Sequence, residues 1–340
     1  MQLGIYLNSQ HPVSDDPARR FAETLEQVRL IRSLGFDSIW AGEHHITPGF
    51  HFFPQFSLLQ RIAADAEGLW LGTNVTLLPL HNPVEIAEVG AFMDVITGGK
   101  FLLGVALGYR PEEFAMYGVP MSERASRLAE AVGIIRQLWS GERLTHEGRH
   151  WQFSNATIAP RPRQTPTPPI IIGAQVEAAI ARAAKIGDGW LVVPIPTLEQ
   201  LARQMASYTR ARAAANLPMS KYICRLIEVG CAKDEETAYR RVGPHLIEKY
   251  KAYFSWGLEG LSLDPKAAPE QQFRNLARNR FAVGSPSQVI DMLLAHHRAG
   301  IHHLSMRVSW PGMGQDDILA GIELLGRKVV PEVRRQTSSG

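Results

Sequence analysis

Residues 70–83 read WLGTNVTLLPLHNP, and residues 100–109, reached after one helix-length segment, read KFLLGVALGY. Both contain short, nearly continuous apolar runs bounded by turn residues, the pattern of parallel strands covered on both faces. Between them, Pro83 begins a predicted helix and Gly98-Gly99 ends it. The sequence therefore predicts a β-α-β unit with its chemistry at the carboxyl ends of the strands. The loop residues at those ends are Thr73, Asn74, His81, Asn82, Gly108, Tyr109 and Arg110.

The same alternation of strands and helices continues along the chain, and about eight strands are each followed by a helix in nearly every case. This pattern predicts a (β/α)₈ (TIM) barrel of the α/β class. The alternative, a doubly wound open sheet, usually has a Gly-rich turn after its first strand, and Asn8-Ser9-Gln10 supplies none. The predicted strands are 3–7, 36–40, 70–78, 101–105, 170–172, 190–193, 223–232 and 301–308.

Three segments interrupt the alternation. Residues 144–153, with Gly148-Arg149 in the middle, predict a small inserted β-hairpin. Residues 255–279 show weak periodicity with several glycines and prolines, which is typical of a functional lid. The proline-rich connector 160–169 has the composition of a linker, but a strand follows it directly at Ile170. We therefore expect one domain over residues 1–340.

Composition excludes several classes of partner. A formal net charge of +3 without a Lys/Arg run argues against nucleic acid. No apolar run approaches the roughly eighteen residues of a membrane span, and the first residues lack the pattern of a signal peptide. Cys224 and Cys231 match neither a zinc spacing nor a disulfide framework, so we expect buried thiols in a reducing compartment, the cytoplasm.

Glu43-His44-His45 follows the second predicted strand. Because consecutive side chains of an extended segment face opposite ways, we expect only one of these histidines to point into the barrel mouth. Such a histidine can equally satisfy a backbone carbonyl. With His81, the three residues could also bind a divalent metal. Metal-dependent barrel hydrolases, however, carry His-x-His on the first strand and a later Asp, and this first strand has neither, so no metal site is predicted.

Several segments, in the same order as in the family, resemble the luciferase-like flavin monooxygenase superfamily. They are Glu43-His44-His45, GTNVTLLPLHNPVEIAE at 72–88, Gly98-Gly99-Lys100-Phe101 leading to GVALGYRPEEF at 104–114, and GSPSQVIDMLLAHHRAGIHHLSMR at 284–307. The resemblance covers nearly the whole chain. It implies a (β/α)₈ barrel that binds flavin at the carboxyl ends of its strands, and oxygen chemistry with reduced FMN from a separate NAD(P)H-dependent reductase. A sister branch uses a deazaflavin for hydride transfer, and some members bind flavin without turnover.

The resemblance also implies roles for individual residues. His44 matches the catalytic histidine of the family, and a non-prolyl cis peptide bond is expected at Asn74-Val75. Small residues at the strand ends would let the backbone approach the flavin ring. The implied flavin-binding residues are Asn74, Ala106, Leu107, Tyr109, Gly173, Ala174 and Gln175.

Two positions depart from the luciferase pattern near the flavin phosphate. Luciferases carry an arginine where this chain has Leu107, and a hydroxyl residue where it has Val176. Glu177 would repel a phosphate, although the helix that begins there offers free N–H groups. The cations that could compensate are Arg110, Arg124 and Arg127.

These expectations combine into one functional hypothesis. The chain is expected to be the oxygenase of a two-component flavin-dependent monooxygenase, acting on a small apolar or carbonyl substrate. His44, with a reference pKa near 6.5, would exchange a proton with the bound reactants. Phe50, Phe52 and Phe53, with the 255–279 segment, could exclude water, or could equally anchor their own loops. The family also implies a homodimer or homotetramer.

Overall fold

Eight parallel strands form a closed barrel in the computed structural model, which describes residues 1–258, 263 and 266–338. They are β1 (Gln2–Tyr6), β3 (Ser38–Ala41), β5 (Trp70–Thr73), β6 (Phe101–Val105), β9 (Ile170–Gly173), β10 (Gly189–Val192), β11 (Tyr222–Cys231) and β13 (His303–Arg307). Their order is β10-β9-β6-β5-β3-β1-β13-β11, and parallel pairing of β10 with β11 closes the ring. The predicted (β/α)₈ barrel is confirmed.

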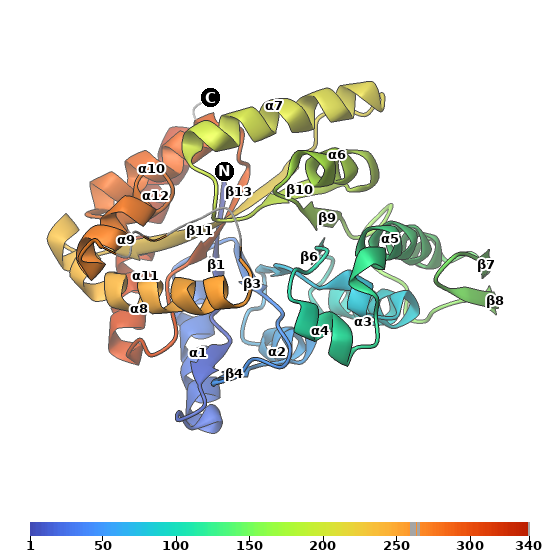
Figure 1. Cartoon of the computed structure of the whole chain (residues 1–340), viewed down its shortest axis with the longest axis horizontal. Coiled ribbons are helices and arrows are strands. Elements are labelled where there is room, and N and C mark those ends of the chain that lie inside the picture. The colour runs from blue at the N-terminus through green and yellow to red at the C-terminus, as the bar shows by residue number, and fades with distance from the viewer. Residues whose placement is uncertain (259–262, 264–265, 339–340) are drawn as a thin grey trace.

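Helices surround the barrel (Figure 1). Several begin with a capping side chain: Thr197 and Ser285 each form a capping box, and the Asn82 side chain accepts the N–H of Val84. The helices are α1 (Pro17–Ser33), α2 (Gln55–Ile62), α3 (Pro83–Ile96), α4 (Pro111–Met116), α5 (Arg124–Ser140), α6 (Glu177–Ile186), α7 (Leu198–Ala214), α8 (Glu235–Ser255), α9 (Pro269–Ala277), α10 (Pro286–Arg298), α11 (Gln315–Leu324) and α12 (Val330–Thr337). A π-helical turn, η3 (Leu325–Val329), joins the last two.

The barrel interior is filled by side chains, so the space available to a ligand lies above it, at the carboxyl ends of the strands. Tyr6, Trp40, Leu102, Ile171, Leu191, Cys224 and Leu226 form this interior cluster. Both cysteines are free and buried, and burial raises the pKa of each thiol to about 12. Of the helices in the described part of the chain, none is long and apolar enough to cross a membrane.

The strand predicted over 70–78 is too long. β5 ends at Thr73, the following Asn74-Val75 peptide bond is cis, and Leu78–Leu80 form a 3₁₀ turn, η1. The apolar run continues beyond the strand because its side chains pack in the loop, while the backbone N–H of Leu77 donates to the Glu43 carboxylate at 2.6 Å. At Leu77 a side-chain acceptor therefore replaces a strand partner, although Thr76 still pairs with β6 through its N–H and the Gly104 carbonyl at 2.8 Å.

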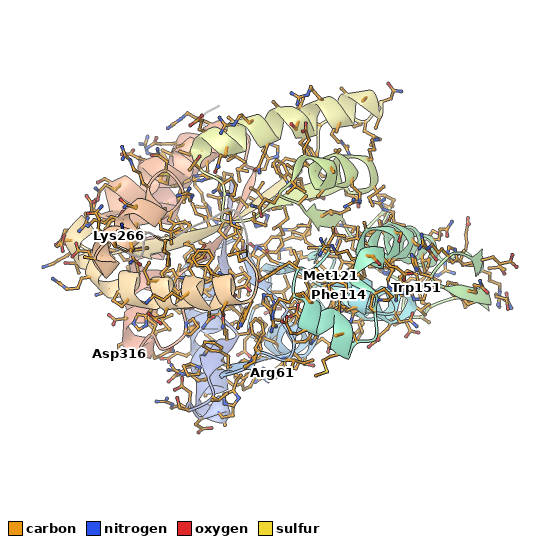
Figure 2. All side chains as sticks on the ribbon, in the orientation of Figure 1. Arg61, Phe114, Met121, Trp151, Lys266 and Asp316 are labelled. Carbon is orange, nitrogen blue, oxygen red and sulfur yellow. The ribbon has the colours of Figure 1, made fainter. Side chains whose placement is uncertain are left out.

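The predicted hairpin is confirmed as β7 (Leu144–Glu147) and β8 (Gln152–Ala156), at the edge of the molecule in Figure 1. Figure 2 labels Trp151 beside it. Two other short pairings were not predicted. β2 (Gln10–Pro12) pairs with β4 (Phe50–Phe52), and β12 (Ala282–Gly284) pairs with the last residues of β11. Three-residue strands are too short for periodicity to reveal.

The irregular chain predicted over 255–279 is partly wrong, whereas the role of this segment as a lid stays a prediction. Residues 259–262 and 264–265 lie outside the described residues. Within the remainder, α9 is a regular helix, and Phe273, Leu276 and Ala277 on it are buried. Phe273 packs against Gly243 of α8, where an added Cβ would lie 2.9 Å from the phenylalanine ring. One short apolar face is too little periodicity to be recognised in the sequence.

The connector 160–169 is fixed to the barrel by one buried carboxylate. Asp94 of α3 accepts the backbone N–H groups of Arg163 and Gln164 at 2.6 and 2.8 Å, and the Gln164 side chain at 2.6 Å. Strands on both sides of the connector belong to the same barrel. A linker between independent units would not be held in this way.

We expect Asp94→Ala to lower the free energy of unfolding by about 2 to 4 kcal/mol, because three donors lose a buried acceptor. Urea denaturation measures this change. Asp94→Asn, which keeps one acceptor oxygen, is the matched control and should lose less. An Asp94→Ala protein as stable as the wild type would show that the connector does not depend on this carboxylate.

Candidate active site

One cavity of about 290 Å³ opens at the carboxyl ends of the barrel strands. It is lined by every residue for which the sequence implied a catalytic or flavin-binding role: His44, Asn74, Ala106, Leu107, Tyr109, Gly173, Ala174 and Gln175. These residues come from the ends of β3, β5, β6 and β9 and the loops that follow them. Their convergence is a property of the fold, while their chemical roles stay predictions.

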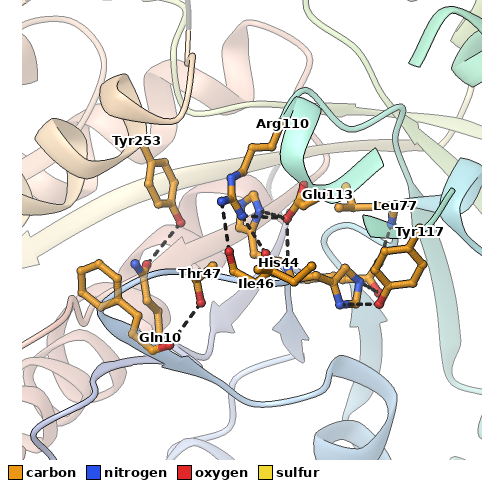
Figure 3. A network of polar contacts seen from close by, with 12 residues as sticks. Gln10, His44, Ile46, Thr47, Leu77, Arg110, Glu113, Tyr117 and Tyr253 are labelled. Carbon is orange, nitrogen blue, oxygen red and sulfur yellow. Dashed lines mark hydrogen bonds and ion pairs between the residues drawn. The ribbon is translucent and has the colours of Figure 1, made fainter. Parts of the chain in front are cut away.

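His44 lines this cavity, and its ring is hydrogen-bonded to Glu113 of α4, which does not line the cavity. The His44 Nδ1 lies 3.0 Å from the Glu113 Oε1, which also accepts the His45 backbone N–H at 2.9 Å and Arg110 Nη1 at 3.2 Å (Figure 3). Burial raises the pKa of Glu113, but the hydrogen bonds from His44 and the His45 N–H, with the charge of Arg110, outweigh it and hold the pKa below its ordinary value. An ionised carboxylate only accepts, so Nδ1 carries the hydrogen and Nε2 is the basic nitrogen of the neutral ring.

Four aromatic rings surround His44. Their centroids lie 5.6 to 5.9 Å from that of the imidazole, and they belong to Phe52, Tyr109, Tyr253 and Trp256. Of the other predicted wall residues, Phe50 contacts Trp256, while Phe53 packs against His11 and Phe21 and anchors its own loop. The aromatic surroundings reduce the access of water to the imidazole.

His45 points away from the cavity, as strand alternation predicts, into a cluster centred on Glu43. The Glu43 Oε1 accepts His45 Nε2 and His81 Nε2, both at 2.8 Å. Burial raises the pKa of Glu43, but the hydrogen bonds from the two histidines outweigh it and lower the pKa to about 2. The three ligand atoms lie within 4.8 Å of one another and could hold a metal ion. In this structure the two histidines are hydrogen-bonded to the Glu43 carboxylate, and the absence of a metal stays a prediction.

The cavity has a floor of small residues. A Cβ added to Gly173 would lie 3.1 Å from the Ala106 Cβ and 3.4 Å from Val75, so only glycine keeps this surface flat. The adjoining Asn74-Val75 peptide is cis, as the resemblance implied. Asn74 Nδ2 and the Tyr109 hydroxyl are buried here without a hydrogen-bond partner among the described residues. Burial also raises the pKa of Tyr109, so it remains a neutral donor. Floor and donors together fit a flat ring with polar edges.

One end of the cavity offers groups suited to an anion. Gln175 and Ala179 line it next to the N-terminus of α6, whose N-cap residue, Val176, makes no side-chain capping bond. Of the three arginines considered above, Arg124 has the fewest bonds, one of 3.4 Å to the carbonyl of Gly108; Gly108 lines the cavity, whereas Arg124 does not. Arg110 is used by the His45 and Ile46 carbonyls, and Arg127 by the Pro79 carbonyl.

The opposite wall was not predicted. It comes from Lys249, Tyr250 and Tyr253 of α8, with Arg307 at the end of β13. Arg307 lies near the end of the last predicted strand, 301–308, and could have been noted as a rim residue. Lys249 lies in the middle of a long helix, and no local pattern shows which way such a side chain points.

Comparison with known proteins assigns the class. A family model described as luciferase-like monooxygenase matches residues 1–303, and the chain belongs to this family. The chain is 24% identical to the oxygenase component of a flavin-dependent trigonelline monooxygenase from Acinetobacter baylyi, over 97% of this chain and 95% of that one. It is 27% identical to an F420-dependent glucose-6-phosphate dehydrogenase from Microbacterium testaceum, over 92% and 94%. The structure of monooxygenase RslO1 from Streptomyces bottropensis matches with a TM-score of 0.85 at 25% identity, covering 98% of this chain and 99% of that one.

Proposed function

We propose that this single-domain protein is a flavin-dependent monooxygenase that uses reduced FMN and molecular oxygen to oxidise a small apolar or carbonyl substrate. The observation that carries the proposal is the juxtaposition of His44 with the flat floor at Ala106 and Gly173 in one cavity. The family membership and the relation to a flavin-dependent oxygenase component support it.

The residues present fit FMN. Asn74 Nδ2 and the Tyr109 hydroxyl, both without partners in the described chain, can hydrogen-bond to the polar edge of the ring. Ala106, Gly173 and Ala174 allow the ring to lie against the backbone. Arg124 and the first N–H groups of α6 would hold the phosphate. When bound, reduced FMN supplies the electrons that activate oxygen.

His44 is the proposed proton-transfer residue. Its Nε2 can accept a proton from a reactant in the cavity, and the Glu113 carboxylate, hydrogen-bonded to Nδ1 at 3.0 Å, stabilises the imidazolium that results. The surrounding aromatic rings limit competing proton exchange with water.

The proposal includes partners. Reduced FMN would come from a separate NAD(P)H-dependent reductase, consistent with the relative named as an oxygenase component. Exposed Phe92 and Ile96 on α3 favour a homodimer or homotetramer. Two unpaired cysteines favour a cytoplasmic, reducing location.

A deazaflavin-dependent oxidoreductase is the second candidate, favoured by the 27% identity to an F420-dependent dehydrogenase. A barrel that binds flavin without turnover is the third. Anaerobic titration with reduced FMN and with reduced deazaflavin, followed by admission of ¹⁸O₂ in the presence of a panel of small carbonyl and apolar compounds, separates them. Tight binding of FMN with ¹⁸O in an oxidised product is the expected result. Tight deazaflavin binding without oxygen uptake would support the second candidate, and flavin binding without any reaction the third.

A further inference from the structure

Two buried cations share one carboxylate in the wall of the cavity opposite the flat floor. Lys249 and Arg307 are 3% and 5% exposed, and Glu228 of β11 is fully buried. The Glu228 Oε1 accepts Lys249 Nζ at 2.5 Å and Arg307 Nη1 at 3.1 Å. The cluster carries a net positive charge when Lys249 is protonated, and a buried net charge is costly unless something neutralises it.

The Glu228 carboxylate accepts four hydrogen bonds, whereas Lys249 and Arg307 still have N–H donors without an acceptor among the described residues. Glu228 also accepts the Tyr250 hydroxyl at 3.1 Å and Trp310 Nε1 at 2.8 Å. Within the described part of the chain, Lys249 and Arg307 each donate one hydrogen bond, and both go to Glu228. An ammonium has three donors and a guanidinium five, so most of their donors remain for a ligand. Both cations line the cavity, whereas Glu228 does not.

The cation pair lies close to His44 through one shared neighbour, Tyr253. The Tyr253 ring centroid is 5.8 Å from that of His44, and the Lys249 Nζ is 4.9 Å from the same Tyr253 ring. Arg307 lies over the Tyr6 ring at 4.2 Å. A small molecule held by the cations would therefore extend past aromatic surfaces toward the imidazole and the flat floor.

We propose that Lys249 and Arg307 form a subsite for an anionic oxygen group, a carboxylate in the first instance, of the substrate. Assigning the anion to the substrate rests on the proposed function, in which the opposite end of the cavity takes the FMN phosphate. The substrate class is thus narrowed from a small apolar or carbonyl compound to a small organic anion with an apolar body.

Titration of Lys249 gives the subsite a pH dependence. Burial and the charge of Arg307 lower the pKa of Lys249 to about 7, against the opposing effect of Glu228. A carboxylate ligand stays ionised above about pH 5, so its own charge does not change in this range. Anion binding should therefore strengthen as the pH falls from 8.5 to 6. The titratable groups that face Lys249 in the described part of the chain are Glu228, Arg307, Tyr250 and Tyr253, and Tyr6 in turn faces Arg307.

Calorimetric titration of the FMN-loaded protein with benzoate and its neutral isostere benzamide tests the subsite. We expect benzoate to bind about tenfold more tightly than benzamide at pH 6, as befits charge-assisted hydrogen bonds. Lys249→Met should abolish this preference, and Lys249→Arg should retain it. Lys251→Met removes an exposed lysine from the same helix and should change neither affinity. The titration needs no turnover, so its result is independent of whether the protein is a monooxygenase.

A second variant shifts the pH dependence, which misfolding cannot imitate. Glu228→Gln removes the carboxylate that helps to keep Lys249 protonated, so the pH above which benzoate binding weakens should move to a lower value. A wild-type protein that binds neither probe or shows no preference for benzoate, a preference that survives Lys249→Met, or a pH dependence that Glu228→Gln leaves unchanged would overturn the proposal. So would a Lys249→Met protein whose affinity for FMN falls by the same factor as that for benzoate, since the cations would then serve the cofactor.

Discussion

Replacing His44 by alanine is expected to lower kcat for substrate oxidation by about 100- to 10,000-fold, the usual contribution of a positioned acid-base group. The Glu113 carboxylate keeps its bonds to the His45 N–H and Arg110, so the loop should remain folded. Steady-state turnover, measured with reduced FMN supplied in excess, gives the change.

The control for this prediction is flavin binding. FMN affinity of His44→Ala should stay within about threefold of the wild type, because the floor at Ala106 and Gly173 and the donors Asn74 and Tyr109 are unchanged. Full substrate oxidation by the alanine variant would remove His44 from the mechanism. Loss of FMN binding would instead make it a structural residue.

Replacing Ala106 by leucine should weaken FMN binding by about 10- to 100-fold, because the larger side chain occupies the floor on which the ring is proposed to lie. Ala106 is partly exposed and lines the cavity, so the leucine side chain can extend into the cavity without disturbing the packing of the barrel core. Fluorescence titration with FMN measures the affinity.

Ala213→Leu makes the same substitution at an exposed position on α7 and should leave FMN affinity unchanged. Thermal denaturation of both variants checks that the fold is intact. Wild-type affinity in a folded Ala106→Leu protein would place the ring elsewhere and contradict the proposed binding mode.

The barrel could be predicted because strands covered on both faces leave continuous apolar runs, and because the capping residues Thr197 and Ser285 mark helix starts without tertiary information. The predicted end of a strand was wrong where the backbone bonds to a side chain distant in the sequence. Beyond the strand that ends at Thr73, the Leu77 N–H is bonded to the Glu43 carboxylate, and nothing near Leu77 in the sequence reveals that contact.

The half of the site built on strand ends was also predictable, since the barrel brings all such ends to one rim. The half carried by α8 was not, because the direction of Lys249 depends on how the helix rotates against β11. One signal was available in the sequence. Arg225 and Glu228 interrupt the otherwise apolar predicted strand 223–232, and charged side chains buried in a barrel require partners.

The two walls of the cavity come from separate stretches of the chain. The floor and His44 belong to residues 42–175, whereas Lys249, Tyr253 and Arg307 belong to residues 249–307. The second wall rests on β11, the longest strand of the barrel, whose last residues pair with β12. Substitutions in the second stretch can therefore change which compounds the cavity accepts while leaving His44 and the floor unaltered.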